Sequence, residues 1–349
     1  MVTVEMGHGP AEVYLDFYGC VVKVVSTAGK CVEDVRRDFS HFVCSQPPPG
    51  THSVTIRLHR ENPPPAPAQA RRVFRTRQAV CYEHERIRYV DYPGTALVRY
   101  DFDSEEAVVF SLDDDILHEV SYLVVLSRVG ELLDKKGIHR IHSLAVSVGG
   151  SAAICLLPMG GGKTTLALEL VKEKDCLLLS DEIAAIDQQL RVLPFPLRIG
   201  VRAAESIPPD IPAGYLRPYR TISFGSKTLI DLEYFAERVA REPASLEMVL
   251  LGERTTAGKP GFRKASKLMG LYQVLRHIIF AYQLPRTKAY ILRCERGYMR
   301  ALPAIFLSRI VTGLRIALSV ECYRFRLTEH PRENAKVLAT LMRERTRGI

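Results

Sequence analysis

The segment from residue 154 to residue 165 reads Ile-Cys-Leu-Leu-Pro-Met-Gly-Gly-Gly-Lys-Thr-Thr and decides how the middle of the chain folds. Its apolar first half is typical of a buried strand, and the run 166–171 that follows it is typical of a helix. Only residues without a side chain let a backbone come close enough to a phosphate for successive N–H groups to point at it. The start of the next helix adds its positive end. The segment therefore predicts a phosphate-binding loop between a strand and a helix.

Each position of the loop has its own expected role. The glycines, Lys163 and Thr165 would hold the phosphate chain, with Lys163 on the β- and γ-phosphates, while the hydroxyl of Thr164 would hold Mg²⁺. The glycines are Gly160, Gly161 and Gly162. The full pattern has a further glycine where this chain has Leu157, so the loop is expected to begin without a positive φ there, helped by Pro158. The alternative is a glycine-rich turn that Lys and Thr follow by chance.

Bulk properties place the chain among soluble globular proteins. Its 349 residues suffice for two domains, and 47% of them are hydrophobic and 25% charged. The eight cysteines are scattered and form no C-x-x-C pair, which indicates neither a zinc site nor a disulfide framework. The start of the chain has no signal-peptide pattern, and no apolar stretch is expected to reach the length of a membrane span. These features favour a cytoplasmic location and no transmembrane segment.

Positive charge is concentrated in the last third. The net charge is +9, and residues 241–349 carry 21 Lys and Arg against 8 Asp and Glu. Such a region suits an acidic partner, an anionic membrane surface or a polyphosphate, or it is simply a solvated helical surface. Aromatic residues are not interleaved with the cations in a stripe, so a nucleic-acid partner is not expected.

Periodicity divides the chain into two predicted domains. Residues 1–112 contain short alternating runs and are expected to form a mostly β domain with an antiparallel sheet. A helix is predicted from Asp113 to about Lys136, and the acidic residues at its start read as capping rather than as a metal site. It opens the second domain, 113–349, whose C-terminal part is expected to be helical from about residue 240. Expected elements there are helices over 267–282 and 301–318, a strand over 323–327 and a last helix from Pro331.

The elements around the loop predict a mixed α/β sheet rather than a purely parallel one. A hairpin over 144–157 leads into the loop, and a helix over 164–173 leads out of it. A strand over 177–179 then ends at Ser180-Asp181-Glu182, and a second hairpin covers 183–193.

His142-Ser143-Leu144-Ala145-Val146, the hairpin, the glycine loop and the acidic strand end together resemble the C-terminal catalytic domain of HPr kinase/phosphorylase. The resemblance covers roughly residues 137–200 and is closer to divergent HPr-kinase-like proteins than to HPr kinase itself. It implies a P-loop core of the kind shared with phosphoenolpyruvate carboxykinases. It also implies a kinase that uses ATP and Mg²⁺.

The resemblance further implies roles for the acidic pair. One acid of the family's pair is the base for the acceptor hydroxyl and the other contacts the metal. The nearest match here is Asp181 and Glu182, with Asp181 assigned as the catalytic base and both acids as candidate metal contacts. Aligned without a gap, Ser180 would stand at the first acidic position, which would leave Asp181 as a metal contact only. His142 would orient the nucleophile or bind phosphate, although a lone histidine in a strand is often only hydrogen-bonded in the core.

Three cations after the strand ends are candidates to clamp a phosphate, with surface ion pairing as the alternative. They are Arg198, Arg202 and Lys227, of which Lys227 is favoured because it follows a glycine. His139 is expected at the surface.

The function predicted from these residues is transfer of the γ-phosphate of ATP to a hydroxyl, most plausibly a Ser or Thr of a peptide or small protein. Two alternatives remain: a nucleotide-binding pseudokinase that acts as a switch or scaffold, and a kinase for a small hydroxyl metabolite. A homo-oligomer is compatible with the resemblance.

Overall fold

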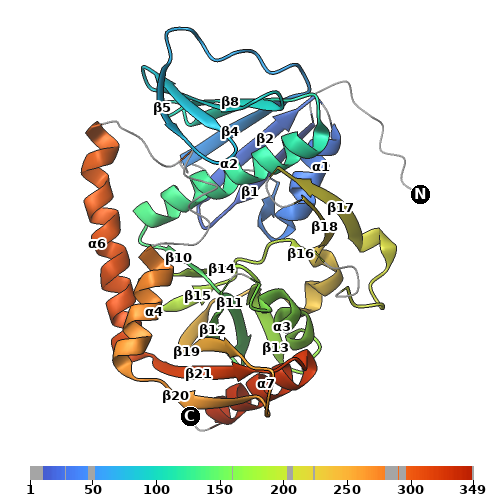
Figure 1. Cartoon of the computed structure of the whole chain (residues 1–349), viewed down its shortest axis with the longest axis vertical. Coiled ribbons are helices and arrows are strands. Elements are labelled where there is room, and N and C mark those ends of the chain that lie inside the picture. The colour runs from blue at the N-terminus through green and yellow to red at the C-terminus, as the bar shows by residue number, and fades with distance from the viewer. Residues whose placement is uncertain are drawn as a thin grey trace. The chain divides into compact units, whose positions relative to one another are not determined.

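The computed structural model describes residues 11–27, 29–45, 52–158, 160–202, 207–222, 225–279, 290 and 296–347 (Figure 1). The end of the helix predicted over 267–282 lies outside these residues. Contacts divide the chain into two compact units. One comprises Met1–Glu131, Tyr219–Ser226 and Pro285–Arg293, and the other Leu132–Pro218, Lys227–Leu284 and Cys294–Ile349. The first unit therefore continues beyond residue 112 into the helix that follows.

A nine-stranded sheet forms the first unit, in the order β3-β1-β2-β4-β9-β8-β7-β6-β5. β4 pairs in parallel with β2 and β9, whereas the remaining pairs are antiparallel, so the mostly antiparallel prediction is confirmed. Helix α1, which the sequence did not predict, packs on β1 and β2. The elements are β1 (Ala11–Asp16), β2 (Cys20–Ser26), α1 (Gly29–Asp38), η1 (Ser40–Phe42), β3 (Val43–Cys44), β4 (His52–His59), β5 (Arg71–Arg75), β6 (Val80–His84), β7 (Ile87–Tyr92), β8 (Ala96–Asp101) and β9 (Glu106–Phe110).

Helix α2 (Asp114–Lys135) begins and ends as its sequence predicts. Oδ1 of Asp113 accepts hydrogen bonds from the backbone N–H groups of Asp115, at 2.9 Å, and Ile116, at 3.3 Å. This carboxylate therefore caps the helix, which confirms the capping interpretation of the acidic run. At the other end Gly137 has a φ of +73° and Ile138 donates its N–H to the carbonyl of Leu133, which is the usual geometry of a helix C-terminus.

The second unit is built on a mixed sheet in the order β10-β14-β15-β19-β12-β11-β13, with β21 beside the far part of β19 and β20 beside β21. β19 runs parallel to β12 and β21, and the other pairs of this sheet are antiparallel. The mixed sheet is thus as predicted. Its elements are β10 (His139–His142), β11 (Leu144–Val148), β12 (Ser151–Leu156), α3 (Lys163–Leu170), β13 (Cys176–Ser180), β14 (Ile183–Ile186), β15 (Arg191–Leu193), β19 (Ala244–Arg254), β20 (Gly261–Lys264), α4 (Lys267–Ile279), α6 (Arg296–Ser319), β21 (Glu321–Leu327) and α7 (Pro331–Arg347).

A smaller sheet in the order β16-β18-β17 and two short 3-10 helices complete the described elements. They are β16 (Ile199–Val201), η3 (Ala213–Tyr215), β17 (Leu216–Thr221), β18 (Gly225–Ile230) and η4 (Leu232–Arg238).

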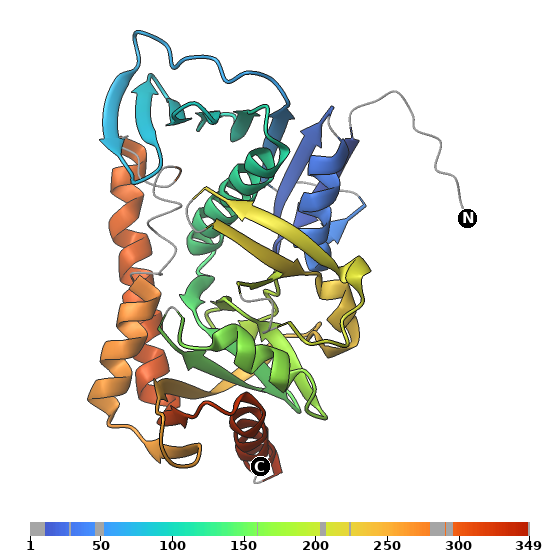
Figure 2. The ribbon, with the colours of Figure 1, turned by 45° about the vertical axis from the view of Figure 1, so that its right-hand side comes forward.

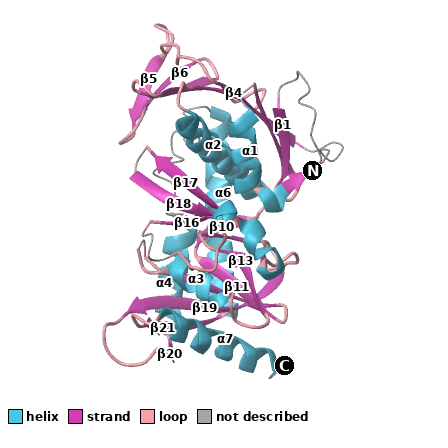
Figure 3. Ribbon diagram, turned by 90° about the vertical axis from the view of Figure 1, so that its right-hand side faces the viewer, coloured by secondary structure: helices cyan, strands magenta, loops and turns pink. Residues whose placement is uncertain are grey.

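Helices cover both faces of the larger sheet of the second unit, as the ribbon coloured by secondary structure illustrates (Figure 3). Along β12, Ala153 and Cys155 join a buried cluster with residues of α3 and α7. The alternate residues Ala152 and Ile154 join a second cluster with residues of α4 and α6. Both faces of this strand are therefore buried, which explains why its sequence is continuously apolar.

β19 corrects the prediction that the chain is helical from about residue 240. This 11-residue strand lies in the middle of the sheet, and the helical part begins only with α4. Met248 and Leu250 face one buried cluster, and Val249 and Leu251 face the other. The run 248–251 is buried on both faces and has no alternation, so this part of the sequence is not distinguished from a helix.

α6 corrects the prediction that no stretch is long and apolar enough to cross a membrane. Residues Ala301–Ser319 are long enough and, with a mean hydropathy of 1.6, apolar enough to meet both criteria. Of that stretch, 17% is buried. Arg309 and Arg315 interrupt the apolar run in the sequence without lowering its hydropathy far enough to exclude it.

Candidate functional site

The glycine loop lies between β12 and α3, where the sequence predicts it. Gly160 and Gly162 have positive φ angles of 72° and 91°, and Gly162 occupies the N-cap position of α3. The N–H of Gly161 donates to the carbonyl of Pro158 at 3.0 Å, which closes a tight turn. The first intrahelical bond is donated by Leu166 to Gly162, so the N–H groups at the start of α3 are left for another acceptor.

Each of the glycines is required for a physical reason. A Cβ at Gly160 or Gly162 would meet nothing within 4 Å, but the left-handed backbone there disfavours any other residue. A Cβ at Gly161 would lie 2.9 Å from the carbonyl oxygen of Pro158. The space beside Gly160 and Gly162 is open, so an anion can approach the backbone N–H groups there.

Leu157 explains how the loop begins without the first glycine of the full pattern. It is not among the residues with a positive φ, and its side chain is fully buried. A Cβ at Gly252 of β19 would lie 2.2 Å from Cδ2 of Leu157, so the absence of a side chain at Gly252 makes room for this leucine. The entry to the loop is thereby anchored in the core.

Lys163 lies over the loop. Its Nζ donates to the carbonyl oxygens of Leu157, at 2.7 Å, and Pro158, at 3.3 Å. Burial lowers the pKa of this ammonium group, and the charges of Asp181 and Glu182 oppose that shift. A lysine held by neutral carbonyls in this way is available to a phosphate group that replaces them.

Thr164 and Asp181 form a side-chain pair at the site. The hydroxyl of Thr164, in the first turn of α3, donates to Oδ2 of Asp181 at the end of β13, at 3.1 Å. Oδ1 of Asp181 is buried and has no hydrogen-bond partner among the described residues. Burial raises the pKa of this carboxyl to about 6, with the like charge of Glu182 adding to the effect, whereas Thr164, Lys163 and Lys227 lower it.

Ser180 and Asp181 have different partners at the end of β13, and which of them corresponds to the family's first acid stays a prediction. Its Oγ accepts the N–H of Ile183 at 2.9 Å and its side chain is buried. Asp181 is therefore the residue of this strand end that meets Thr164, while the next residue, Glu182, is exposed.

These oxygen atoms fit a magnesium ion. Mg²⁺ prefers oxygen ligands and is usually bound by one or two carboxylates together with phosphates and water. A buried carboxylate oxygen without a partner, beside a threonine hydroxyl and a phosphate loop, is such a donor set. Among the described residues no group of three or more His, Cys, Asp or Glu side chains forms a metal cluster.

His142 and His277 lie at the same site. Nδ1 of His277, on α4, is 3.1 Å from the backbone oxygen of His142 at the end of β10. Burial and the positive charge of Lys163 lower the pKa of His142 to about 4, and burial also lowers the pKa of His277. Both rings are therefore neutral near pH 7. The sequence did not predict His277, since it lies 135 residues from His142 in a helix whose periodicity indicates only packing.

The three predicted phosphate-binding cations, Lys227, Arg198 and Arg202, lie in different surroundings. Nζ of Lys227 lies 2.8 Å from the position of a Cβ at Gly200, so the lysine crosses β16 where no side chain stands in its way, and its charge acts on Asp181. Arg198 is buried just ahead of β16, and Arg202 is exposed just after it. The roles of Arg198 and of Thr165 at the site remain predictions.

His139 is not at the surface as predicted, but fully buried. Its Nδ1 is 2.8 Å from Oδ1 of Asp134, and its Nε2 is 2.8 Å from the hydroxyl of Ser308. Its role in the described structure is therefore to connect elements within the core of the second unit.

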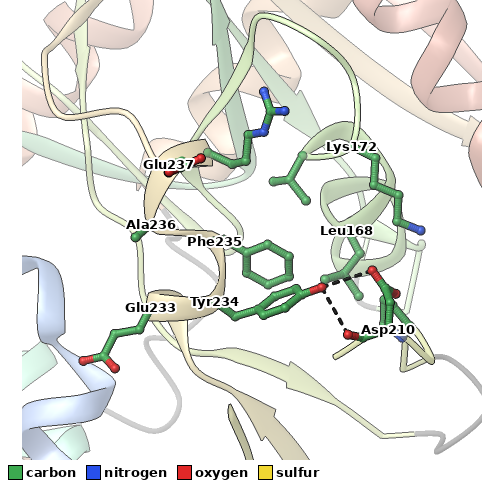
Figure 4. Close-up of a pocket in the computed structure, with 11 residues that line it drawn as sticks. Leu168, Lys172, Asp210, Glu233, Tyr234, Phe235, Ala236 and Glu237 are labelled. Carbon is green, nitrogen blue, oxygen red and sulfur yellow. Dashed lines mark hydrogen bonds between the residues drawn. The ribbon is translucent and has the colours of Figure 1, made fainter. Parts of the chain in front are cut away.

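A separate cavity of about 520 Å³ opens beside the C-terminal half of α3 (Figure 4). Leu168 of α3 and Lys172, just after the end of α3, line it opposite Tyr234 and Phe235 of η4. The hydroxyl of Tyr234 donates to Oδ2 of Asp210 at 3.0 Å. None of the loop glycines, Lys163, Thr164 or Asp181 lines it, so it is distinct from the candidate phosphate site.

Comparison with known protein families found no match, and no curated protein matched the chain. Among solved structures the chain is similar to one described as the HPr(Ser) kinase/phosphatase from Coxiella burnetii, with 11% sequence identity and a TM-score of 0.27, covering 60% of this chain and 95% of that one. At this identity and TM-score the relationship is distant and defines neither the activity nor the fold of this chain in detail. The sheets and helices of the chain themselves show a mixed α/β architecture.

Proposed function

We propose that this chain is a kinase that uses ATP and Mg²⁺ and transfers the γ-phosphate to a hydroxyl group. The observation that carries the proposal is the pairing of Thr164 with Asp181 beside a glycine loop that has open space next to Gly160 and Gly162. Phosphoryl transfer requires positioning and neutralisation of charge far more than covalent help from the protein, and this site supplies both.

Each residue has a role in the proposal. Gly160, Gly161, Gly162 and Thr165 bind the phosphates through the backbone, and Lys163 moves from the loop carbonyls to the β- and γ-phosphates. Thr164 and Asp181 hold Mg²⁺, which supplies neutralisation of the phosphate charge when it is bound. Lys227 and Arg198 are candidates to contact the transferred phosphate.

The reaction forms a bond from the acceptor oxygen to the γ-phosphorus and breaks the bond from that phosphorus to the oxygen bridging it to the β-phosphate. The proton of the hydroxyl passes to a carboxylate. Asp181 faces Thr164 and is the better metal carboxylate, so the exposed Glu182 is the candidate base next to it. His142, neutral and buried beside Lys163, is a candidate to orient the acceptor. The acceptor is a Ser or Thr of a peptide or small protein, or the hydroxyl of a metabolite.

Calorimetric titration with Mg²⁺ and ATP tests the first half of the proposal. We expect binding by the wild-type protein and at least about tenfold weaker binding by Lys163→Ala, because a charged hydrogen-bond partner of the phosphates is lost. Lys172→Ala is a control on the surface beyond the end of α3, where the lysine pairs with Glu169 at 2.6 Å. This variant should bind normally. Absence of binding by folded wild-type protein would overturn the proposal.

Transfer of labelled γ-phosphate tests the second half. Label found on a peptide or protein acceptor supports a protein kinase, and label on a low-mass acceptor supports a metabolite kinase. A pseudokinase is the second candidate, since only an exposed acid stands next to the metal carboxylate. Binding without transfer to any acceptor, unchanged in Glu182→Gln, would favour it.

A further inference from the structure

α4 and α6 present an apolar surface that nothing in the described structure covers. The two helices lie side by side in both Figure 1 and Figure 2. We call this surface the α4–α6 face and define it by six side chains that are between 38% and 77% exposed: Leu268 and Tyr272 of α4, and Leu307, Val311, Leu314 and Leu318 of α6. Exposed apolar patches of this extent mark interaction sites in soluble proteins.

The apolar residues of α6 form one continuous stripe. Leu307, Val311, Leu314 and Leu318 follow one another at intervals of four, three and four residues, which places them on one side of the helix. The stripe is free of acidic side chains, because the stretch 301–319 contains none.

The two arginines of this stretch are tied to the second unit. Arg309 donates to Oδ2 of Asp134 at 2.5 Å and to the carbonyl of Ile278 at 2.8 Å. Arg315 donates to the carbonyl of Gln188 at 2.6 Å. Their guanidinium groups are thus bonded toward the protein, and the stripe itself remains apolar.

α6 is held too firmly in the second unit to cross a membrane. Ile316 is fully buried in the cluster beneath the sheet, and a Cβ at Gly313 would lie 2.7 Å from Cδ2 of Leu275 on α4. Crossing a bilayer would require breaking these contacts and leaving Asp134 without Arg309. A helix with one packed side and one apolar side fits a position parallel to a membrane surface.

The positive charge near the α4–α6 face distinguishes between two possible partners, a second copy of the chain and an anionic lipid surface. Lys267 and Arg276 of α4 are exposed near the face. A second copy would bring the same positive surface against this one and be repelled, whereas anionic lipids would be attracted.

We propose that the α4–α6 face binds the surface of an anionic lipid bilayer, with α6 lying in the interface and its apolar stripe among the acyl chains. The cations around the face bind lipid headgroups. This proposal is independent of the proposed kinase activity, since it uses none of the residues of the phosphate loop.

Vesicle flotation of the full chain tests it. We expect the protein to float with vesicles of phosphatidylcholine containing about a quarter phosphatidylserine, and to bind at least about tenfold less to phosphatidylcholine alone or in high salt. The double variant Leu307→Glu/Leu314→Glu should also lose at least about tenfold in binding, because two charges would enter the acyl region. Leu112→Glu, at a leucine 54% exposed and outside the face, is the matched control and should float as the wild type does.

Circular dichroism melting of each variant checks that loss of binding is not loss of fold. Failure of the wild type to float with the anionic vesicles, or equal flotation of the double variant, would overturn the proposal. So would a dimer in analytical ultracentrifugation that the double variant dissociates, because the face would then be covered by a second copy.

Discussion

The hydroxyl of Thr164 donates a 3.1 Å hydrogen bond to Oδ2 of Asp181, which joins the first turn of α3 to the end of β13. The two residues lie 17 positions apart in the sequence, and the second carboxylate oxygen of Asp181 is buried beside them without a hydrogen-bond partner among the described residues. Folding therefore fixes a carboxylate and a hydroxyl at the glycine loop before any ligand binds. This preorganisation is costly for the metal-free protein and useful to a bound cation.

Removing the hydroxyl should weaken magnesium-dependent nucleotide binding. Thr164→Ala is expected to reduce the affinity for ATP in the presence of Mg²⁺ by about tenfold, because one oxygen ligand is lost. Thr164→Ser keeps the hydroxyl and is expected to bind nearly as the wild type does. Titration calorimetry with and without EDTA measures both, and equal loss in the two variants would show that the hydroxyl is not the group responsible.

The raised pKa of Asp181 predicts how the stability of the metal-free protein depends on pH. Folding raises this pKa from 3.8 to about 6. The contribution of Asp181 to the free energy of unfolding is therefore fully present below the pKa of the unfolded state and is lost as the pH rises from about 4 to about 6. Asp181→Asn removes the charge and is expected to increase the free energy of unfolding at pH 7 by at most about 3 kcal/mol, with the difference vanishing near pH 4.

Urea denaturation in EDTA at several pH values measures this difference. Mg²⁺ and ATP should stabilise the wild-type protein but not Asp181→Asn. Asp181 would then lower the stability of the metal-free protein and still be required for ligand binding. A variant that is less stable than the wild type at every pH would contradict the burial argument.

Gly162 should be irreplaceable for binding but not for folding. Ala at its φ of +91° is strained by about 1–2 kcal/mol, and its Cβ would stand in the open space that the phosphates are proposed to occupy. Gly94→Ala is the matched control, because φ is +71° there and its Cβ also meets nothing within 4 Å. We expect similar loss of stability in thermal melts of the two variants, but loss of nucleotide binding only in Gly162→Ala. Normal nucleotide binding by Gly162→Ala would show that the glycine loop is not part of the binding site.

Local features of the sequence predicted most of the second unit. The hairpin before the loop, the glycine triplet and the acidic strand end each occupy a few consecutive residues, and their chemistry follows from those residues alone. The choice between Ser180 and Asp181 as the base position was different, since neighbouring residues of a strand point to opposite sides. The structure shows that Asp181 faces Thr164 and that Ser180 accepts the N–H of Ile183, and the assignment of the base stays a prediction.

Contacts between residues far apart in the chain could not be predicted from the sequence. His277 reaches His142 across 135 residues, and Arg309 reaches Asp134 across 175. No periodicity reports such pairs, which is also why His139 was wrongly expected at the surface. The apolar pattern of α6 likewise shows that one side is hydrophobic without showing how little of it the rest of the unit covers.

The ion pair of Arg309 and Asp134 provides a test of how α6 is held. Both side chains are largely buried, and Oδ1 of Asp134 also meets Nδ1 of His139 at 2.8 Å. Arg309→Met would leave the aspartate buried without its main partner and is expected to lower the free energy of unfolding by about 3–5 kcal/mol. In Arg324→Met, by contrast, an exposed pair with Glu253 is lost, which should lower the free energy of unfolding far less because solvent screens that pair. Urea denaturation measures both values. If the two costs were equal, the arginine would not anchor α6, and the argument that this helix lies on a membrane rather than across it would lose its support.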